Sequence, residues 1–228
     1  MSHSISIPEI MKTTASALMY VYAYSWTPGF CFNQTDYPGC ISQTQTQTQD
    51  YWKTNFTVHG LWPQYIDNGY PSYCNNDDLN ETEIVADIGW DTLTQKWPNV
   101  QCDETDPEYD SFWEHEWTKH GTCSGLNQDI YFETAINLTD VLLTPTEIQS
   151  HLGESINADE LRDAFFGSPW VALQCNKNAE TSEYYLTGAY TCWEQNADDG
   201  SVGEQIVCPA EVVNEDTCYA DDIFIPEL

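Results

Sequence analysis

The pattern of apolar and polar positions predicts two kinds of segment along this chain. Runs rich in Tyr, Val, Phe and Trp predict strands over residues 16–26, 56–61, 169–175, 183–192 and 205–208. Apolar residues that recur with helical spacing predict helices around 81–97, 111–119, 129–143 and 157–166. Because the helices fall in the middle and the strands at both ends, this order favours an α+β domain over an alternating parallel α/β one.

Polar stretches without periodicity mark the parts that we expect to lie outside this framework. Residues 1–14 predict a poorly ordered N-terminal segment, and "QTQTQTQ" (43–49) predicts a surface loop. No internal repeat or interdomain linker is visible, so residues 15–228 are expected to form a single domain. Asn157, three residues before Glu160, is expected to cap the last helix, whose first turn is acidic.

Nine cysteines are scattered singly along the chain with no CxxC pair, so zinc-ribbon spacing is absent. Widely spaced cysteines in a loop-rich chain indicate disulfides and an oxidising compartment. Four N-x-[ST] sequons, at Asn33, Asn55, Asn80 and Asn137, indicate a glycoprotein. We therefore expect a protein that is secreted or lies in a lysosomal or vacuolar lumen. Nine is an odd number, so at least one cysteine stays unpaired within the chain.

No stretch of the sequence approaches the roughly 18 apolar residues that are needed to span a bilayer. The nearest, "ASALMYVYAY" (15–24), is short and rich in tyrosine. It predicts a buried strand rather than the apolar core of a signal peptide. We expect no membrane partner, and the sequence contains no obvious targeting segment.

The balance of charge is strongly acidic, with 37 Asp and Glu against 6 Lys and Arg and a formal net charge of -31. Such a charge repels polyanionic partners, most strongly at low salt. The simplest interpretation is a solvated acidic shell that keeps the protein soluble. An acidic lumen or a salty medium would suit it, because protonation or screening weakens self-repulsion.

The segment "FWEHEWTKHGTC" (112–123) concentrates bases in a chain that has few of them. On a helix, Glu116 and His120 share a face at i, i+4, and His115 has the same spacing from Lys119. A zinc-binding helix needs H-E-x-x-H, whereas H-E-W-T-K-H places its histidines about 140° apart with a lysine between them. We therefore expect no metal site. A cysteine nucleophile is not expected either, because the cysteines are taken to form disulfides.

A second concentration of chemistry is "FTVHGLWPQY" (56–65), where His59 follows a strand-like triplet and Gly60 permits a tight turn. Taken alone, this histidine is most simply a packed imidazole at the end of a strand. Together with the helix, it completes a set for acid–base transfer at a phosphodiester. One imidazole removes a proton, the other supplies one to the leaving oxygen, and cations stabilise the charge on the phosphate.

These two segments resemble the two active-site blocks of the ribonuclease T2 family of secreted acid ribonucleases. The similarity covers about residues 16–218, in the family's order, through "YAYSWTPGFC", "GYPSYC", "KWPNVQC", "PWVALQCN", "YTCWE" and "IVCP". The resemblance implies an α+β domain with a central antiparallel sheet, flanked by helices and stapled by disulfides. It also implies an endoribonuclease that acts on single-stranded RNA with no cofactor and no metal. We expect a monomer.

The resemblance gives each polar residue of the two blocks a role. His120 matches the general base that takes the proton of the ribose 2′-hydroxyl, and His59 matches the general acid that protonates the leaving 5′-oxygen. Glu116 and Lys119 match the pair that stabilises the phosphorane, and His115 matches a phosphate-binding imidazole. The product would be a 2′,3′-cyclic phosphate, opened slowly to a 3′-phosphate. One imidazole must be neutral and the other protonated, so an acidic optimum is expected, with both pKa values raised by the acidic surface.

Base recognition is implied at two places. Trp62 and Tyr70 match one nucleobase site, and Asn99 and Phe112 match the second base site of plant members. For these aromatic residues, ordinary core packing is an equal alternative. Base preference stays open because two positions depart from the plant pattern: Ser25 and Gln101.

The resemblance also implies four disulfides: Cys31–Cys40, Cys74–Cys123, Cys175–Cys218 and Cys192–Cys208. Cys102 would then be the odd cysteine, although in some members the residue here bridges toward the region of Cys40. The Cys74–Cys123 bond would tie the end of the catalytic helix to the loop that follows the first block.

A second hypothesis comes from a different class: a secreted protein of the T2 fold that binds or regulates, with catalysis lost or incidental. The net charge of -31 motivates it, because that charge opposes the capture of RNA. The intact set of polar residues in the two blocks argues against it.

Overall fold

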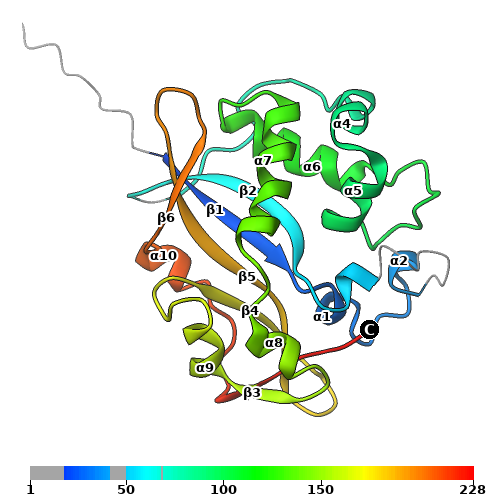
Figure 1. The fold of residues 1–228 in the computed structure, drawn as a ribbon, viewed down its shortest axis with the longest axis vertical. Helices are drawn as coiled ribbons and strands as arrows, with labels where there is room; N and C mark the ends of the chain where they lie inside the picture. Colours follow the sequence, from blue (N-terminus) through cyan, green and yellow to red (C-terminus); the bar gives the residue numbers. More distant parts are fainter. Residues whose placement is uncertain (1–17, 42–49, 68) are drawn as a thin grey trace, which may run out of the picture.

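The computed structural model describes residues 18–41, 50–67 and 69–228. These residues form one α+β domain around a seven-stranded sheet (Figure 1). The strands are β1 Leu18–Ser25, β2 Thr57–Tyr65, β3 Ser155–Asn157, β4 Ala172–Lys177, β5 Tyr184–Gln195, β6 Val202–Ile206 and β7 Asp222–Phe224. Their order is β2-β1-β5-β7-β3, and β4 and β6 also pair with β5. The predicted α+β class is therefore confirmed.

The long strand β5 joins the parts of this sheet. It pairs with β1 in antiparallel register from Met19↔Glu194 to Ser25↔Gly188, and β1 pairs in turn with β2. Gly188 is required because a side chain at this position would overlap the carbonyl of Tyr24. Among the described strands, every pair is antiparallel except β5 with β7. The strand that holds the first sequence block, β2, is thus an edge strand beside β1.

The helices cover the sheet in two groups. Those of the described residues are α1 Thr27–Cys31, α2 Pro38–Ile41, α4 Glu81–Ile88, α5 Trp90–Lys96, α6 Ser111–Lys119, α7 Gln128–Val141, α8 Thr146–Ser150, α9 Ala158–Asp163 and α10 Ala210–Val213, with a 3-10 turn at Gly121–Cys123. Figure 1 shows α4, α5, α6 and α7 gathered on one side of the sheet, while α8, α9 and β3 lie toward its other end.

Most predicted segments are present with shifted ends. The single helix predicted over 81–97 is wrong: α4 and α5 are separate helices, because Gly89 between them has φ 94°, outside the helical range. The helix over 111–119 has the predicted bounds. The cap at Asn157 is confirmed, since its side chain accepts hydrogen bonds from two backbone N–H groups of the first turn of α9.

The short elements β3, β7, α1, α2, α8 and α10 were not predicted, because three to five residues hold too little periodicity to detect. The N-terminal segment 1–14 and the loop 43–49 lie outside the described residues.

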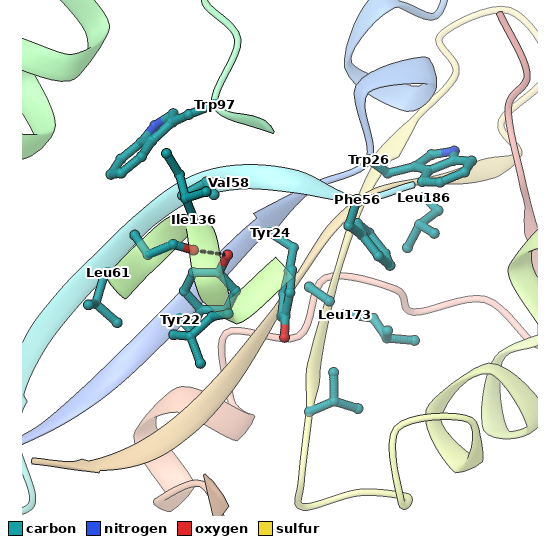
Figure 2. Packing of buried hydrophobic residues seen from close by; sticks show 14 of the residues in the cluster. Tyr22, Tyr24, Trp26, Phe56, Val58, Leu61, Trp97, Ile136, Leu173 and Leu186 are labelled. Atoms are coloured by element: carbon teal, nitrogen blue, oxygen red, sulfur yellow. Dashed lines mark hydrogen bonds between the residues drawn. The ribbon is translucent and has the colours of Figure 1, made fainter. Parts of the chain in front are cut away.

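The main core lies between the sheet and the helices on its covered side (Figure 2). Tyr22 and Tyr24 of β1, Val58 of β2 and Trp97 after α5 are each at most 3% exposed. The hydroxyl of Tyr22 donates to the carbonyl of Ala135 in α7 at 2.7 Å, so its polar end is satisfied inside the core. β1 is therefore the buried strand that the composition predicts, and residues 16 and 17 of the predicted strand lie outside the described residues.

Four disulfides staple the domain: Cys31–Cys40, Cys74–Cys123, Cys175–Cys218 and Cys192–Cys208. They are the four pairs that the resemblance implies. Cys102 forms no disulfide with any described cysteine, and the side chain of Asn99 donates a weak hydrogen bond to its sulfur at 3.7 Å.

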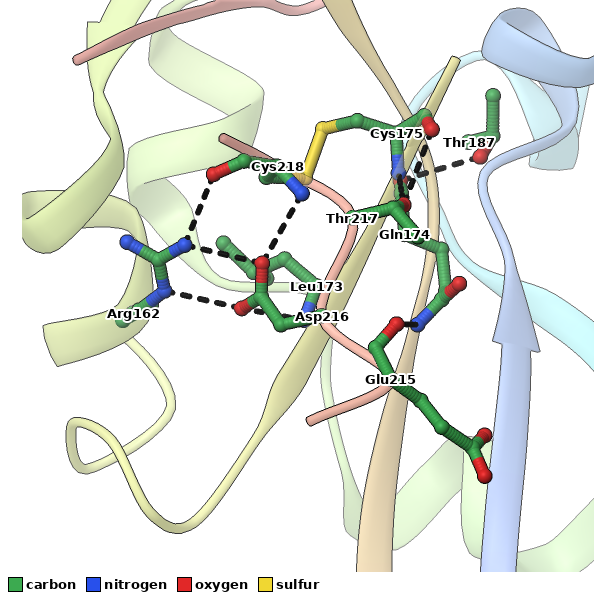
Figure 3. The surroundings of a disulfide bond; sticks show 9 residues. All are labelled: Arg162, Leu173, Gln174, Cys175, Thr187, Glu215, Asp216, Thr217 and Cys218. Atoms are coloured by element: carbon green, nitrogen blue, oxygen red, sulfur yellow. Dashed lines mark hydrogen bonds and ion pairs between the residues drawn. A yellow bond between two sulfur atoms is a disulfide. The ribbon is translucent and has the colours of Figure 1, made fainter. Parts of the chain in front are cut away.

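One ion pair beside the Cys175–Cys218 bond joins α9 to the C-terminal segment (Figure 3). Arg162 donates to both carboxylate oxygens of Asp216 and to the carbonyl of Cys218, each at 3.0 Å. Bidentate pairing of this kind is among the stronger charged contacts in proteins. One of only six Lys and Arg residues is therefore used by the scaffold.

Replacing Cys74 and Cys123 together by alanine is expected to lower the free energy of unfolding by roughly 4 kcal/mol, because this bond closes a loop with a sequence separation of 49. The matched control replaces Cys31 and Cys40, whose separation is 9, and should cost roughly 3 kcal/mol. Urea unfolding of the two variants measures the difference. A larger loss in the control variant would contradict this ordering.

Candidate active site

A β-bulge presents His59 at the edge strand. The β1–β2 pairing runs Ala23↔Gly60 and then Tyr24↔Val58, so His59 is the extra residue of β2 with no partner opposite it. Its side chain is 40% exposed, although both chain neighbours are buried. The tight turn that Gly60 would permit is not made, because β2 continues through it, as the strand predicted over 56–61 requires. The bulge instead turns the imidazole out of the sheet.

Gly60 allows α6 to approach β2 closely. A side chain at this position would overlap Oε2 of Glu116 and Nε1 of Trp62. Those two atoms are themselves joined, since the Trp62 indole N–H donates to Glu116 Oε2 at 2.7 Å. The missing Cβ therefore makes room for a hydrogen bond between the two sequence blocks.

The second block forms α6 and the turn that follows it. Glu116 faces the sheet and is 1% exposed, whereas His115 is exposed on the same helix. His120 is the C-cap residue and is 6% exposed. Its Nδ1 is buried without a hydrogen-bond partner among the described residues. Helical spacing thus places a buried carboxyl and an adjacent buried imidazole at the end of one helix, as predicted from the i, i+4 pattern.

Three of these side chains meet at Trp62. Besides donating to Glu116, its ring stacks on His120 with centroids 5.2 Å apart and an interplanar angle of 26°. The ring of His59 meets it edge-on at 5.3 Å. His59 Nε2 lies 3.8 Å from the other carboxyl oxygen, Glu116 Oε1. Both histidines therefore contact the indole that donates to the Glu116 carboxyl group.

The C-terminal end of α6 is held by the loop that follows β2. The Cys74–Cys123 disulfide joins them, and the backbone N–H of Tyr73 donates to the Lys119 carbonyl at 3.0 Å. The backbone N–H of Cys74 also donates to Thr122 Oγ1 at 3.1 Å. These contacts fix the helix end where Lys119 and His120 lie.

Burial dominates the protonation of the carboxyl group. Desolvation raises the pKa of Glu116 to about 8, while the Trp62 hydrogen bond and the charge of Lys119 act in the opposite direction. Glu116 is therefore mostly a neutral carboxyl group at acidic pH.

The histidines shift the other way, which contradicts the expectation that the acidic surface raises their pKa values. Desolvation, followed by the charges of His115 and Lys119, lowers the pKa of His59 to about 4. Desolvation and then Lys119, His115 and His59 lower the pKa of His120 to about 3. Burial and Lys119 also lower the pKa of His115. Desolvation, with the nearby bases as a smaller second cause, outweighs a distant acidic surface whose charges are screened by solvent.

Lys119 is the cation of this site. Elsewhere in the described residues, Lys53 pairs with Asp50, Lys96 with Asp140, and Arg162 with Asp216, while Lys177 lies over the ring of Tyr184. No described carboxylate lies within ion-pair distance of Lys119. Its charge therefore acts on Glu116 and the three histidines.

A cavity of about 390 Å³ opens beside His59, His115 and Glu116. It extends over Asn99 and Phe112, the two residues matched to the second base site. The ring of Phe112 meets His59 edge-on at 5.4 Å. Asn99 is 6% exposed and its amide donates to the Tyr109 carbonyl at 2.9 Å, so part of its hydrogen-bonding capacity is used internally.

Several residues of this cavity were not found by sequence reasoning: Thr27, Phe30, Thr57, Pro98, Val100 and Ser111. Ser25 and Gln101, noted only as departures from the plant pattern, also line it. They come from α1, from the ends of β1, β2 and α6, and from the loop after α5, and no local motif marks them. Trp62, Tyr70, Lys119 and His120 do not line this cavity; Tyr70 lies beyond His120, with ring centroids 6.3 Å apart.

Two further properties concern metals and membranes. Within residues 18–41, 50–67 and 69–228, no group of three or more His, Cys, Asp or Glu side chains is arranged to hold a metal ion. None of the helices in this part of the chain has both the length and the apolar character needed to cross a bilayer.

Known proteins resemble both the sequence and the fold. The model of the ribonuclease T2 family matches residues 17–201. Ribonuclease 1 of Arabidopsis thaliana is 31% identical over 200 residues, which cover 80% of this chain and 81% of the relative. Intracellular ribonuclease LX of Solanum lycopersicum is 28% identical over 217 residues, covering 86% of each chain.

The fold is also similar to that of solved ribonucleases. The crystal structure of RNase NT in complex with 5'-AMP has a TM-score of 0.64 and 21% identity, and covers 94% of this chain and 100% of its own. The fold brings the two sequence blocks together in one site. The family model and the Arabidopsis relative each cover most of the chain. This chain therefore belongs to the ribonuclease T2 family and is a ribonuclease.

Proposed function

We propose that this ribonuclease cleaves single-stranded RNA by transphosphorylation, without a metal or other cofactor. His120 takes the proton of the 2′-hydroxyl, whose oxygen attacks the phosphorus. The bond to the 5′-oxygen breaks, and His59 gives its proton to that oxygen. The product is a 2′,3′-cyclic phosphate, which water then opens to a 3′-phosphate. The main support is the buried Glu116 carboxyl group, whose tryptophan partner contacts both imidazoles.

The other polar residues stabilise charge on the phosphate. Lys119 supplies the permanent positive charge, and His115 supplies a second one where it is protonated. Glu116 is neutral at acidic pH because burial raises its pKa to about 8, so it is able to donate a hydrogen bond to a phosphoryl oxygen. Glu116 does not need to act as a carboxylate base in this scheme. The lowered pKa of His120 keeps its imidazole neutral, so His120 is available to accept the proton.

The substrate is expected to lie along the exposed rings and the cavity. Tyr70 is 56% exposed beside His120, and Phe112 lines the cavity beside His59, so bases on either side of the scissile phosphate have a ring to stack on. RNase NT, a protein of similar fold, was crystallised with 5'-AMP. The four disulfides favour an oxidising compartment, and we propose a secreted or lysosomal or vacuolar monomer.

Cleavage of polyuridylate in the presence of a chelator is expected to be fastest at acidic pH. His59 must be protonated, and its pKa is lowered to about 4, so kcat/KM should fall about tenfold per pH unit on the alkaline side. Protonation of His120, whose pKa is lowered to about 3, should reduce it at the acid end. Chromatography of the products across the pH range tests both limbs. Loss of activity with the chelator, or no cyclic product at any pH, would contradict the proposal.

His120→Ala is expected to lower kcat by about 10²–10⁴-fold, because the general base is removed. Affinity for a non-cleavable oligonucleotide with 2′-deoxyribose at the scissile position should change far less. The same variant separates the enzyme from the binding hypothesis. If a biological effect of the protein survives His120→Ala while cleavage is lost, the regulatory function gains support.

Added salt is expected to change kcat/KM for polyuridylate only slightly, or to raise it, between low and physiological ionic strength. The net charge of -31 repels the polyanion, and salt screens this repulsion. Only one described lysine is free of a carboxylate or ring partner, so few phosphate contacts are available to be weakened. A dinucleotide substrate serves as the control with little charge. A steep loss of polyuridylate cleavage with salt would rule this out.

A further inference from the structure

Trp62 touches each of the three groups that would do the chemistry. Its indole N–H donates to Glu116 Oε2 at 2.7 Å, its face lies on His120, and its edge region meets His59 at a centroid distance of 5.3 Å. A fourth ring, Tyr190, meets it at 5.3 Å and 67°. No other described side chain has contacts with all three of these groups.

These contacts leave little of Trp62 for a nucleobase. Its ring stacks on His120 and makes T-shaped contacts with His59 and Tyr190, its one polar atom is committed to Glu116, and the side chain is only partly exposed. Tyr70 lies beyond His120 with 56% of its surface exposed and has no bond to Glu116 in the described structure. Of the two rings matched to one base site, Tyr70 is thus the one with a free face.

We propose that Trp62 is a positioning residue for Glu116: it fixes the orientation of the carboxyl group and decides which of its oxygens carries the proton. This inference rests on the proposed function for the role of Glu116 in the reaction.

The argument follows from hydrogen-bond chemistry. A neutral carboxyl group has one O–H donor, and the indole N–H can only donate. A carbonyl oxygen is a stronger acceptor than a carboxyl hydroxyl, so the indole N–H on Oε2 favours the proton on Oε1, the oxygen that lies 3.8 Å from His59 Nε2. The donor is thereby turned to the side of the leaving-group imidazole. Without the indole, the buried carboxyl group could rotate and present either oxygen.

The surroundings of Glu116 offer no substitute for this contact. The charged or titratable groups that face it are His59, Lys119, Tyr131 and Tyr190. The hydroxyl of Tyr131 already donates to the Leu61 carbonyl at 2.9 Å. A side chain at Gly60 would overlap both Glu116 Oε2 and Trp62 Nε1, so the direct indole contact needs glycine there. The carboxyl group therefore depends on Trp62 for its one close hydrogen bond within the described residues.

The kinetic test compares Trp62→Phe with Tyr70→Ala. Phenylalanine keeps a ring against His120 but removes the N–H donor, so kcat should fall about tenfold or more while KM for a dinucleotide changes by less than about threefold. Tyr70→Ala should mainly raise KM. Trp170→Phe, in a remote loop beside Phe166, should leave both constants unchanged. A changed KM or base preference with normal kcat in Trp62→Phe would overturn the inference in favour of a base platform.

A double-mutant cycle tests whether Trp62 acts through Glu116. Adding Trp62→Phe to Glu116→Ala should cost no further kcat, because the group that it positions is absent. Full additivity of the two losses would overturn the inference. Circular dichroism and thermal unfolding confirm that each variant is folded.

A spectroscopic test on the native protein, with Glu116→Gln as its control, needs no RNA. The Nε1–H proton resonance of Trp62 should move downfield with an apparent pKa of about 8, as Glu116 ionises and the hydrogen bond becomes charge-assisted. His59 and His120 titrate much lower, at about 4 and 3, and the pKa of Tyr190 is raised to about 12. Glu116→Gln should abolish the transition. Its persistence in Glu116→Gln, or its absence from the native protein, would overturn the inference.

The outcomes separate this inference from the proposed function. If the native protein cleaves RNA but Trp62→Phe keeps its kcat, the inference fails and the function stands. If the native protein does not cleave RNA but the resonance titrates as described, the function fails and the positioning contact stands.

Discussion

The burial of one carboxyl group between β2 and α6 is the constraint on which the rest of the site depends. Glu116 is 1% exposed and has a single close hydrogen-bond donor, the indole of Trp62. A charged carboxylate in such a place would be costly, so the neutral form is favoured. Gly60 must lack a side chain for this contact to form. The distance and orientation of the helix relative to the strand are therefore set by one polar contact as much as by apolar packing.

The local chemistry also explains how so acidic a protein can handle a polyanion. Most described cations are tied to scaffold carboxylates, as Arg162 is to Asp216, and do not form a phosphate-binding surface. The positive field is confined to Lys119 and to histidines that are charged only in acid. Acid also protonates part of the carboxylate shell and reduces the repulsion of RNA. Substrate capture and the protonation of His59, the proposed general acid, thus favour the same pH range for two separate physical reasons.

Many helix and strand segments could be predicted because they are local or periodic, whereas the pairing of the two blocks came from their complementary chemistry and from the resemblance to the family. The bounds of α6 follow from helical spacing, and the N-cap residue Asn157 marks the start of α9. The break at Gly89 was missed because a glycine inside a helical pattern is ambiguous until its φ is known. The bulge at His59 depends on the register with β1, which no local pattern specifies.

The expectation that the acidic surface raises the histidine pKa values was wrong for the same reason: the decisive contacts are not visible in the local sequence. Composition gives the net charge, but the shifts are governed by burial and by neighbours within one site, which only the folded chain defines.

The same reasoning bears on the choice between an enzyme and a binding module. A site that only bound RNA would gain nothing from a carboxyl group buried against an indole, and replacing a buried ionisable group by a well-packed apolar one is often neutral or stabilising. Keeping Glu116, with an orphaned Nδ1 on the adjacent His120, is a cost in folding free energy. Such a cost is understandable where a reaction needs a proton donor and a neutral imidazole in fixed positions. Binding a phosphate alone needs neither of these groups. The energetics of the buried groups therefore favour catalysis over simple binding.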